Sequence, residues 1–180
     1  MKNNLILLSC LSAGVGQLVA TPAQAEEGKR KQTQEKAPNV IIILADDLGY
    51  GDLQCYGAKN VETPNVNRLA AQGIRFTNTH AVAATSTPSR YSLLTGEYAW
   101  RRPDTDVAAG NAGMIIRPEQ YTMADMFKSA GYRTAAFGKW HLGLGDKTGR
   151  QDWNAPLPCG LADIGFDEHY IMAATADRVP

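Results

Sequence analysis

The sequence predicts an α/β fold with a mainly parallel central sheet flanked by helices. One reason is the continuous β-branched apolar run of residues 39–45, which is typical of a strand covered on both faces. A second is the alternation of strand-like and helix-like segments after it. The hydrophobic fraction of 44% and the charged fraction of 20% are those of a globular chain. Because 18 basic residues balance 18 acidic ones, nucleic-acid binding is not expected.

The N-terminal segment has the pattern of a secretory signal peptide, residues 1–25. Lys2 provides a short charged region, an uncharged and mostly apolar stretch follows, and small residues around Ala25 supply a cleavage site. We therefore expect export to the periplasm or secretion. Lipoprotein anchoring at Cys10 and a buried or membrane-anchored helix are the alternatives, and the apolar run is short for a span, so stable membrane insertion is not expected. Residues 26–38 lack large apolar side chains and predict a disordered leader.

The remaining residues, 39–180, are expected to form one α/β domain, whose elements follow from local signals. Thr63-Pro64 opens a helix that Gly73 ends. A capping box at Thr122 opens another, which Gly131 closes. The expected order is strand 39–45, helix 64–72, strand 74–79, helix 86–94, helix 123–130 and strand 132–137.

Two adjacent carboxylates, Asp46 and Asp47, follow the first expected strand. In parallel α/β sheets, sites gather at the carboxyl ends of strands. Neighbouring carboxylates repel each other and are costly to desolvate unless a cation neutralises them. Oxygen ligands of this kind suit Ca²⁺, with Mg²⁺ as the lesser candidate. The alternative is an exposed acidic turn before Gly49.

A second candidate site is the run Ser86-Thr87-Pro88-Ser89-Arg90. Proline is tolerated only near a helix start, so Ser86 is expected at an N-terminus, where unpaired amides favour an anion. Arg90 lies one helical turn further on the same face. A hydroxyl, a helix N-terminus and an arginine fit a nucleophile that attacks an anionic ester. The alternative is a capping serine beside a surface arginine.

The third candidate is the pair Lys139 and His141, directly after the last expected strand. In an extended chain both side chains point to one side, which places a fixed positive charge beside a group that exchanges protons near neutral pH. The alternative is a pair of surface or structural residues.

In this order, the three runs resemble the N-terminal half of the formylglycine-dependent sulfatases of the alkaline phosphatase superfamily. The resemblance is carried by Asp46-Asp47, Gly49-Tyr50-Gly51-Asp52, Thr63-Pro64-Asn65, the Ser-x-Pro-Ser-Arg run, Leu93-Leu94-Thr95-Gly96 and Gly138-Lys139-Trp140-His141-Leu142-Gly143. It implies that a radical-SAM maturase, reading the motif Ser86, Pro88, Ser89 and Arg90, oxidises Ser86 to formylglycine.

The resemblance also implies roles for the other residues. Asp46, Asp47 and the oxygen of residue 86 would bind Ca²⁺. Arg90 would steady the modified side chain, Lys139 would contact it and the sulfate, and His141 would take a proton from it during product release.

The implied activity is that of a sulfuric ester hydrolase acting on an aryl or carbohydrate sulfate. One alternative is a phosphate or phosphonate ester hydrolase that uses unmodified Ser86, and another is an inactive truncated product that binds calcium or glycans. The resemblance puts the remaining calcium ligands and a second lysine and histidine further downstream than Pro180. We therefore expect the chain to be an incomplete fragment with little activity of its own.

Overall fold

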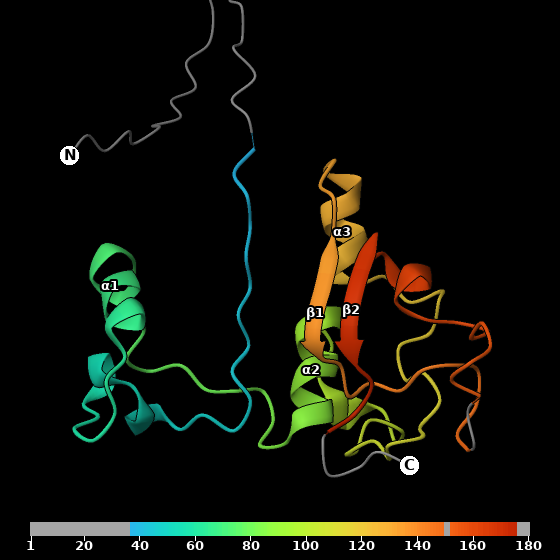
Figure 1. The fold of residues 1–180 in the computed structure, drawn as a ribbon, viewed down its shortest axis with the longest axis horizontal. Helices are drawn as coiled ribbons and strands as arrows, with labels where there is room; N and C mark the ends of the chain where they lie inside the picture. Colours follow the sequence, from blue (N-terminus) through green and yellow to red (C-terminus); the bar gives the residue numbers. More distant parts are fainter. Residues whose placement is uncertain (1–36, 150–151, 176–180) are drawn as a thin grey trace, which may run out of the picture. The chain divides into compact units, whose positions relative to one another are not determined.

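The structure is a computed structural model that describes residues 37–149 and 152–175 (Figure 1). The chain divides into two units, Met1–Ile42 and Ile43–Pro180. The expected signal peptide and all but the last two residues of the expected leader lie outside the described residues. Both therefore stay predictions. All elements below belong to the second unit.

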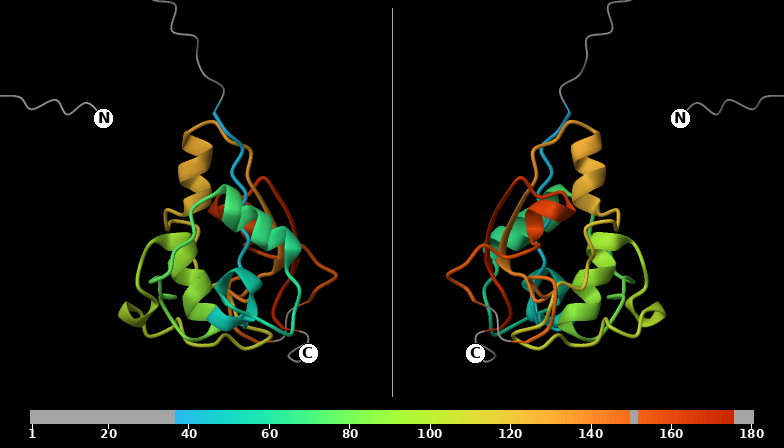
Figure 2. Two further views of the ribbon diagram at one scale, coloured as in Figure 1. Left: turned by 90° about the vertical axis from the view of Figure 1, so that its left-hand side faces the viewer. Right: turned by 90° about the vertical axis from the view of Figure 1, so that its right-hand side faces the viewer.

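A parallel pair of strands, β1 (Ala135–Lys139) and β2 (Glu168–Met172), forms the sheet of the described part (Figure 1). Phe137 lies opposite Tyr170 in the register. The connection between the strands contains a short 3₁₀ helix, η4 (Leu161–Ile164), which lies beside the start of α3 (Met123–Ser129) (Figure 2). Parallel strands need such a crossover, so the pair and its helices confirm the α/β class.

The three expected α-helices are present, with boundaries close to those predicted. They are α1 (Pro64–Gln72), α2 (Ser86–Thr95) and α3. Gly96 ends α2 with a φ of +70°, in the left-handed region that glycine adopts freely. The hydroxyl of Thr122 accepts a hydrogen bond from the Asp125 amide at 3.2 Å, which confirms the capping box. Short 3₁₀ helices complete the set: η1 (Tyr50–Asp52), η2 (Gln54–Tyr56) and η3 (Ala99–Arg101).

Two of the strand predictions are wrong, and a third is shifted. Residues 39–45 and 74–79 pair with no strand in the described part of the chain, and Ile41, Ile43 and Ile74 are each more than 80% exposed. A strand needs a hydrogen-bonded neighbour, which an apolar run does not supply by itself. The third strand, expected at 132–137, is observed as β1 at 135–139. It begins later because the Thr134 amide donates to the Asp167 carboxylate and not to the backbone of a neighbouring strand.

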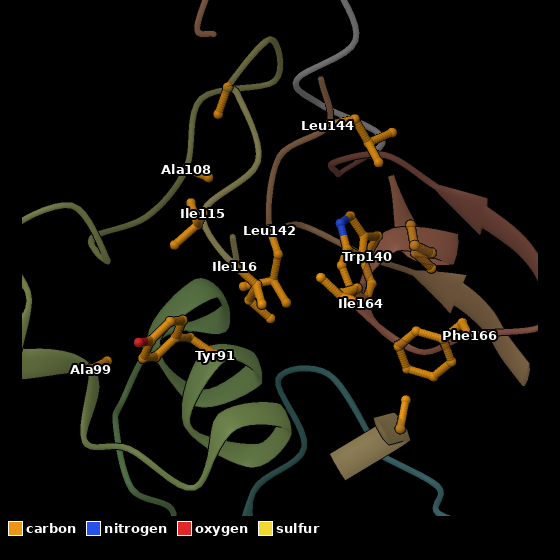
Figure 3. Close-up of a cluster of buried hydrophobic side chains, with 13 residues drawn as sticks. Tyr91, Ala99, Ala108, Ile115, Ile116, Trp140, Leu142, Leu144, Ile164 and Phe166 are labelled. Atoms are coloured by element: carbon orange, nitrogen blue, oxygen red, sulfur yellow. The ribbon is translucent and has the colours of Figure 1, made fainter. Parts of the chain in front are cut away.

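The hydrophobic core collects side chains from α2, from the loop before α3, from the segment that follows β1, and from η4 and the turn after it (Figure 3). Tyr91, Ile116, Leu142 and Ile164 are fully buried within it. The stretch 112–115 pairs with 142–145 through backbone hydrogen bonds, such as Ile115 N to Leu142 O at 2.9 Å. This pairing fixes the chain immediately after Lys139 and His141.

Among residues 37–149 and 152–175, no helix has the length and apolarity to cross a membrane.

Candidate active site

Ser86, the first residue of α2, stands at the centre of a cluster of polar side chains. Its Oγ accepts a hydrogen bond from Arg90 Nε at 3.0 Å and lies 3.1 Å from His141 Nδ1. The amides of a first helical turn lack intrahelical partners and carry a partial positive charge. The hydroxyl therefore lies where negative charge on its oxygen is stabilised.

Arg90 ties three segments of the chain together. Besides Ser86, it donates from Nη1 to the carbonyl of Lys139 at 2.7 Å and from Nη2 to Asp46 Oδ1 at 3.0 Å. Its side chain is 12% exposed. The i to i+4 spacing on α2 puts the guanidinium beside Ser86, and its planar fork reaches the end of β1 with another nitrogen.

Asp46 accepts hydrogen bonds from two cations at once. Its Oδ1 accepts from Arg90, and its Oδ2 accepts from Lys139 Nζ at 2.5 Å. The hydrogen bond from Lys139, followed by that from Arg90, lowers the pKa of the Asp46 carboxyl, while partial desolvation opposes the shift. Asp46 is therefore ionised across the physiological pH range. Its neighbour Asp47 is exposed, with a left-handed backbone at φ +55°.

Lys139 and His141 both reach the cluster, but not by the route predicted. Lys139 ends β1, whereas His141 has a φ of +56°, so the two residues do not share one side of an extended chain. His141 is 2% exposed, and its Nε2 lies 3.0 Å from the Ala108 carbonyl oxygen. The left-handed turn at His141 brings the ring to Ser86, while Lys139 reaches Asp46.

The structure joins five of the eight predicted site residues through direct contacts: Asp46, Ser86, Arg90, Lys139 and His141. The other three are close in sequence but have other surroundings. Asp47 is exposed, Ser89 Oγ donates to the Ala83 carbonyl at 2.9 Å, and Pro88 lines a separate cavity of about 350 Å³ beside η3.

Thr87 and Ala108 also touch the site, although neither was predicted. Thr87 Oγ1 donates to the His141 carbonyl at 2.9 Å and accepts from the Ala108 amide at 3.0 Å. The position of Thr87 inside the serine motif is the only signal that the sequence offers for it. For Ala108, a small residue in an irregular loop, the sequence offers none.

The donor set fits calcium in kind. Asp46, Asp47 and Ser86 present hard oxygen atoms, which Ca²⁺ and Mg²⁺ prefer. Calcium takes about six to eight oxygen ligands, and residues 37–149 and 152–175 contain no cluster of three or more acidic, histidine or cysteine side chains. These three residues are therefore candidates for part of a calcium shell.

Comparison with known proteins identifies relatives of this chain. The family model described as Sulfatase matches residues 38–177. An N-acetylgalactosamine-6-O-sulfatase of Bacteroides thetaiotaomicron is 49% identical over 180 residues, covering all of this chain and 34% of the relative. The steryl-sulfatase of Mus musculus is 39% identical over 167 residues, covering 87% of this chain and 25% of the relative. The chain thus spans about a third or less of the length of these relatives.

Solved structures give the same result. A structure concerned with the metabolism of multiple glycosaminoglycans by Bacteroides thetaiotaomicron superposes with a TM-score of 0.77 at 56% identity, covering 79% of this chain and 30% of that one. A protein in complex with its substrate D-glucosamine-2-N,6-O-disulfate superposes with a TM-score of 0.52 at 40% identity, covering 59% of this chain and 21% of that one. The chain belongs to the sulfatase family.

Proposed function

We propose that the protein is a sulfuric ester hydrolase of sulfated carbohydrates, and that its nucleophile is a formylglycine made from Ser86. The observation that carries the proposal is the position of Ser86 Oγ at the start of α2, between Arg90 Nε and His141 Nδ1. The carbohydrate class is supported by the relatives, which include an N-acetylgalactosamine-6-O-sulfatase and a protein with a disulfated glucosamine substrate.

The position of each residue in the site indicates its role in hydrolysis. Arg90 holds the oxygen of residue 86 and, through its other two hydrogen bonds, fixes the ends of the segments that carry Lys139 and Asp46. The Lys139 ammonium donates to Asp46 Oδ2 and brings to the site a positive charge that can stabilise charge on a sulfate oxygen. His141 Nδ1 is within hydrogen-bond reach of residue 86, as a general base must be.

Two groups would complete this chemistry. As formylglycine, residue 86 would supply a hydrated aldehyde with two hydroxyls. One would attack sulfur and displace the alcohol of the ester, which leaves with a proton, and deprotonation of the other would expel sulfate and restore the aldehyde. Held by Asp46, Asp47 and the residue 86 oxygen, Ca²⁺ would supply a positive charge that polarises a sulfate oxygen.

Maturation and export belong to the same proposal. Ser86 is half-buried in α2, and its hydroxyl is engaged by Arg90, so a radical-SAM maturase would have to act on the unfolded segment. Conversion would then precede folding, and export through the signal peptide of residues 1–25 would follow it. The exported protein would work in the periplasm or outside the cell.

One observation also favours a second candidate function. An unmodified Ser86 at 3.1 Å from His141 Nδ1 has the geometry of a directly activated nucleophile, which could attack a phosphate or phosphonate ester. This second candidate function uses the same residues, with Ser86 unmodified. The two candidates therefore differ in the chemical state of residue 86.

Mass spectrometry of the peptide Phe76–Arg90 distinguishes them, because trypsin cuts after Arg75 and Arg90 and nowhere between. The protein is co-expressed with a radical-SAM formylglycine maturase, with Ser86→Ala and Pro88→Ala as matched controls. We expect a wild-type peptide lighter by two hydrogens, no such species in Ser86→Ala, and much less in Pro88→Ala.

Turnover is then measured with N-acetylgalactosamine 6-sulfate and with an aryl phosphate. An unmodified peptide together with phosphate ester turnover would establish the second candidate. Conversion with calcium binding but no sulfate release would leave a non-catalytic, calcium- or glycan-binding product.

A further inference from the structure

We propose that Thr87 is a positioning residue, whose hydroxyl fixes the His141 ring so that Nδ1 faces the oxygen of residue 86 as a hydrogen-bond acceptor. The importance of this for catalysis rests on the proposed function above. The geometry itself is independent of that function. Thr87 would thus be a further functional residue of the serine motif, at the position between the nucleophile and the proline.

The helical repeat explains why Thr87 faces inward. Ser86 and Arg90 are four residues apart and share the face of α2 that carries the site. Thr87 and Tyr91 are also four apart, and both are 0% exposed. The first turn of α2 therefore presents one hydroxyl to the site and the next hydroxyl to the interior, where it must find hydrogen-bond partners.

Thr87 finds those partners in two distant segments. Its Oγ1 donates to the carbonyl of His141 at 2.9 Å and accepts from the amide of Ala108 at 3.0 Å. A threonine hydroxyl has one proton to give, so the donor and acceptor roles are fixed by these partners. One buried hydroxyl thus joins α2 to the second residue after β1 and to the loop that follows η3.

Ala108 completes a closed circuit of hydrogen bonds that joins Thr87, Ala108 and His141. Its carbonyl oxygen lies 3.0 Å from His141 Nε2. A carbonyl can only accept, so this contact requires a proton on Nε2. In the neutral ring Nδ1 is then the bare nitrogen, and it lies 3.1 Å from Ser86 Oγ. Thr87 Oγ1 accepts from the amide of Ala108, and the carbonyl of Ala108 accepts from the His141 ring. Thr87 therefore acts on His141 twice, directly through the His141 carbonyl and indirectly through Ala108.

The backbone at His141 needs such a restraint. Its φ of +56° is in the left-handed region, which is unfavourable for a residue that carries a side chain. The bond from Thr87 is made to the carbonyl of this same residue. Without it, the backbone can relax toward a commoner conformation, and the ring would turn away from residue 86.

The test uses three variants of the full chain. Thr87→Val keeps the branched shape and removes the hydroxyl, whereas Thr87→Ser restores the hydroxyl without the methyl group. The matched control is Thr105→Val, which removes another buried hydroxyl from the loop next to the site. Thr105 is 3% exposed, and its hydroxyl lies within hydrogen-bond distance of the carbonyls of Ala99 and Arg102.

The readout is the tautomer of His141, measured by ¹⁵N NMR on histidine-labelled protein at a pH where the ring is neutral. The chain has three histidines, and His80→Gln and His169→Gln identify the signals of the other two. We expect well-separated ring nitrogens with the proton on Nε2 in the wild type, in Thr87→Ser and in Thr105→Val. In Thr87→Val the two shifts should converge as the tautomers mix.

Several results would overturn the proposal. These are a wild-type proton on Nδ1, averaged ring nitrogens in the wild type, an unchanged tautomer in Thr87→Val, or an equal change in Thr105→Val. If Thr87→Val fails to fold, the wild-type Thr87 hydroxyl proton decides the question, since it should be protected from solvent exchange and a rapidly exchanging proton would refute the circuit. The protein used carries unmodified Ser86, so this result is separate from the mass test of formylglycine.

Discussion

Replacing Arg90 with lysine should destabilise the protein although the positive charge is kept. The guanidinium donates to three acceptors at once: Ser86 Oγ, the Lys139 carbonyl and Asp46 Oδ1. A lysine ammonium is a point charge on a flexible stem and cannot reproduce this fork. We therefore expect Arg90→Lys to keep the contact with Asp46 and lose the contact with the end of β1.

The size of the effect follows from the three contacts. The hydrogen bond from Arg90 to the Lys139 carbonyl has a charged donor and a half-buried setting, and is worth about 2 kcal/mol. The bond to Ser86 adds roughly 0.5 kcal/mol, because that oxygen keeps His141 as a neighbour. The pair with the 36% exposed Asp46 contributes at most about 1 kcal/mol. Arg90→Lys, which loses the first two contacts, should then cost about 2.5 kcal/mol, and Arg90→Met, which loses all three, up to about 3.5 kcal/mol.

Urea denaturation followed by circular dichroism measures these losses. With an unchanged slope of about 2 kcal/mol per M, a loss of about 2.5 kcal/mol lowers the midpoint by slightly more than about 1 M. Arg117→Lys is the control, since Arg117 is 60% exposed and lies 3.9 Å from its partner Asp104, so its midpoint should not move. A midpoint for Arg90→Lys that stays with the wild type, or one that Arg117→Lys matches, would refute the reasoning.

Two further predictions concern the frame around the site. Gly143→Ala should lower the free energy of unfolding by at least about 2 kcal/mol in thermal denaturation, because φ is +72° and the added Cβ would lie 1.9 Å from the Gly113 oxygen. The control is Gly96→Ala, where φ is +70° but the added Cβ meets open space. It measures the backbone strain alone and should cost clearly less. Asp167 has its pKa lowered from 3.8 to about 2, first by hydrogen bonds from Thr134, so its contribution is fully present above about pH 4 and is lost as pH falls toward 2. Asp167→Asn should therefore remove part of the acid dependence of stability in this window, and an unchanged acid profile would contradict the assignment.

The helices could be predicted because their signals are local. The capping box of Thr122 and Asp125 acts within one turn, and the left-handed Gly96 ends α2 without help from the rest of the chain. At α1, however, the local signal predicted the boundary but not the contact of the residue there. Thr63 precedes α1 as predicted, but its hydroxyl accepts from the Gln54 amide at 3.0 Å instead of capping the helix. Boundaries are thus easier to predict than the contacts of the residues at them.

The strands could be predicted only in part, since pairing is a property of two segments. The apolar run 39–45 has the stronger pattern but no partner in the described residues, whereas β2, with the mixed sequence Glu-His-Tyr-Ile-Met, went unpredicted. Its ladder with β1 is anchored outside the strands, where Thr134 and Asp167 exchange hydrogen bonds. No periodicity in the sequence signals a pairing of that kind.

The site shows the same division between local pattern and tertiary contact. Residue types and motifs put Asp46 and Lys139 separately among the site residues, and the structure joins the two across 93 residues. The direction of His141 was not predictable, because an extended chain would send its ring beside Lys139, and a left-handed turn sends it to Ser86 instead. That turn is made in a stretch whose amides continue the ladder, with His141 N donating to Ala173 O at 3.0 Å. The presence of His141 in the site can therefore be predicted from sequence, but the direction of its ring depends on tertiary hydrogen bonds. A change at Thr87 should for this reason disturb the site without altering Ser86, Arg90 or His141.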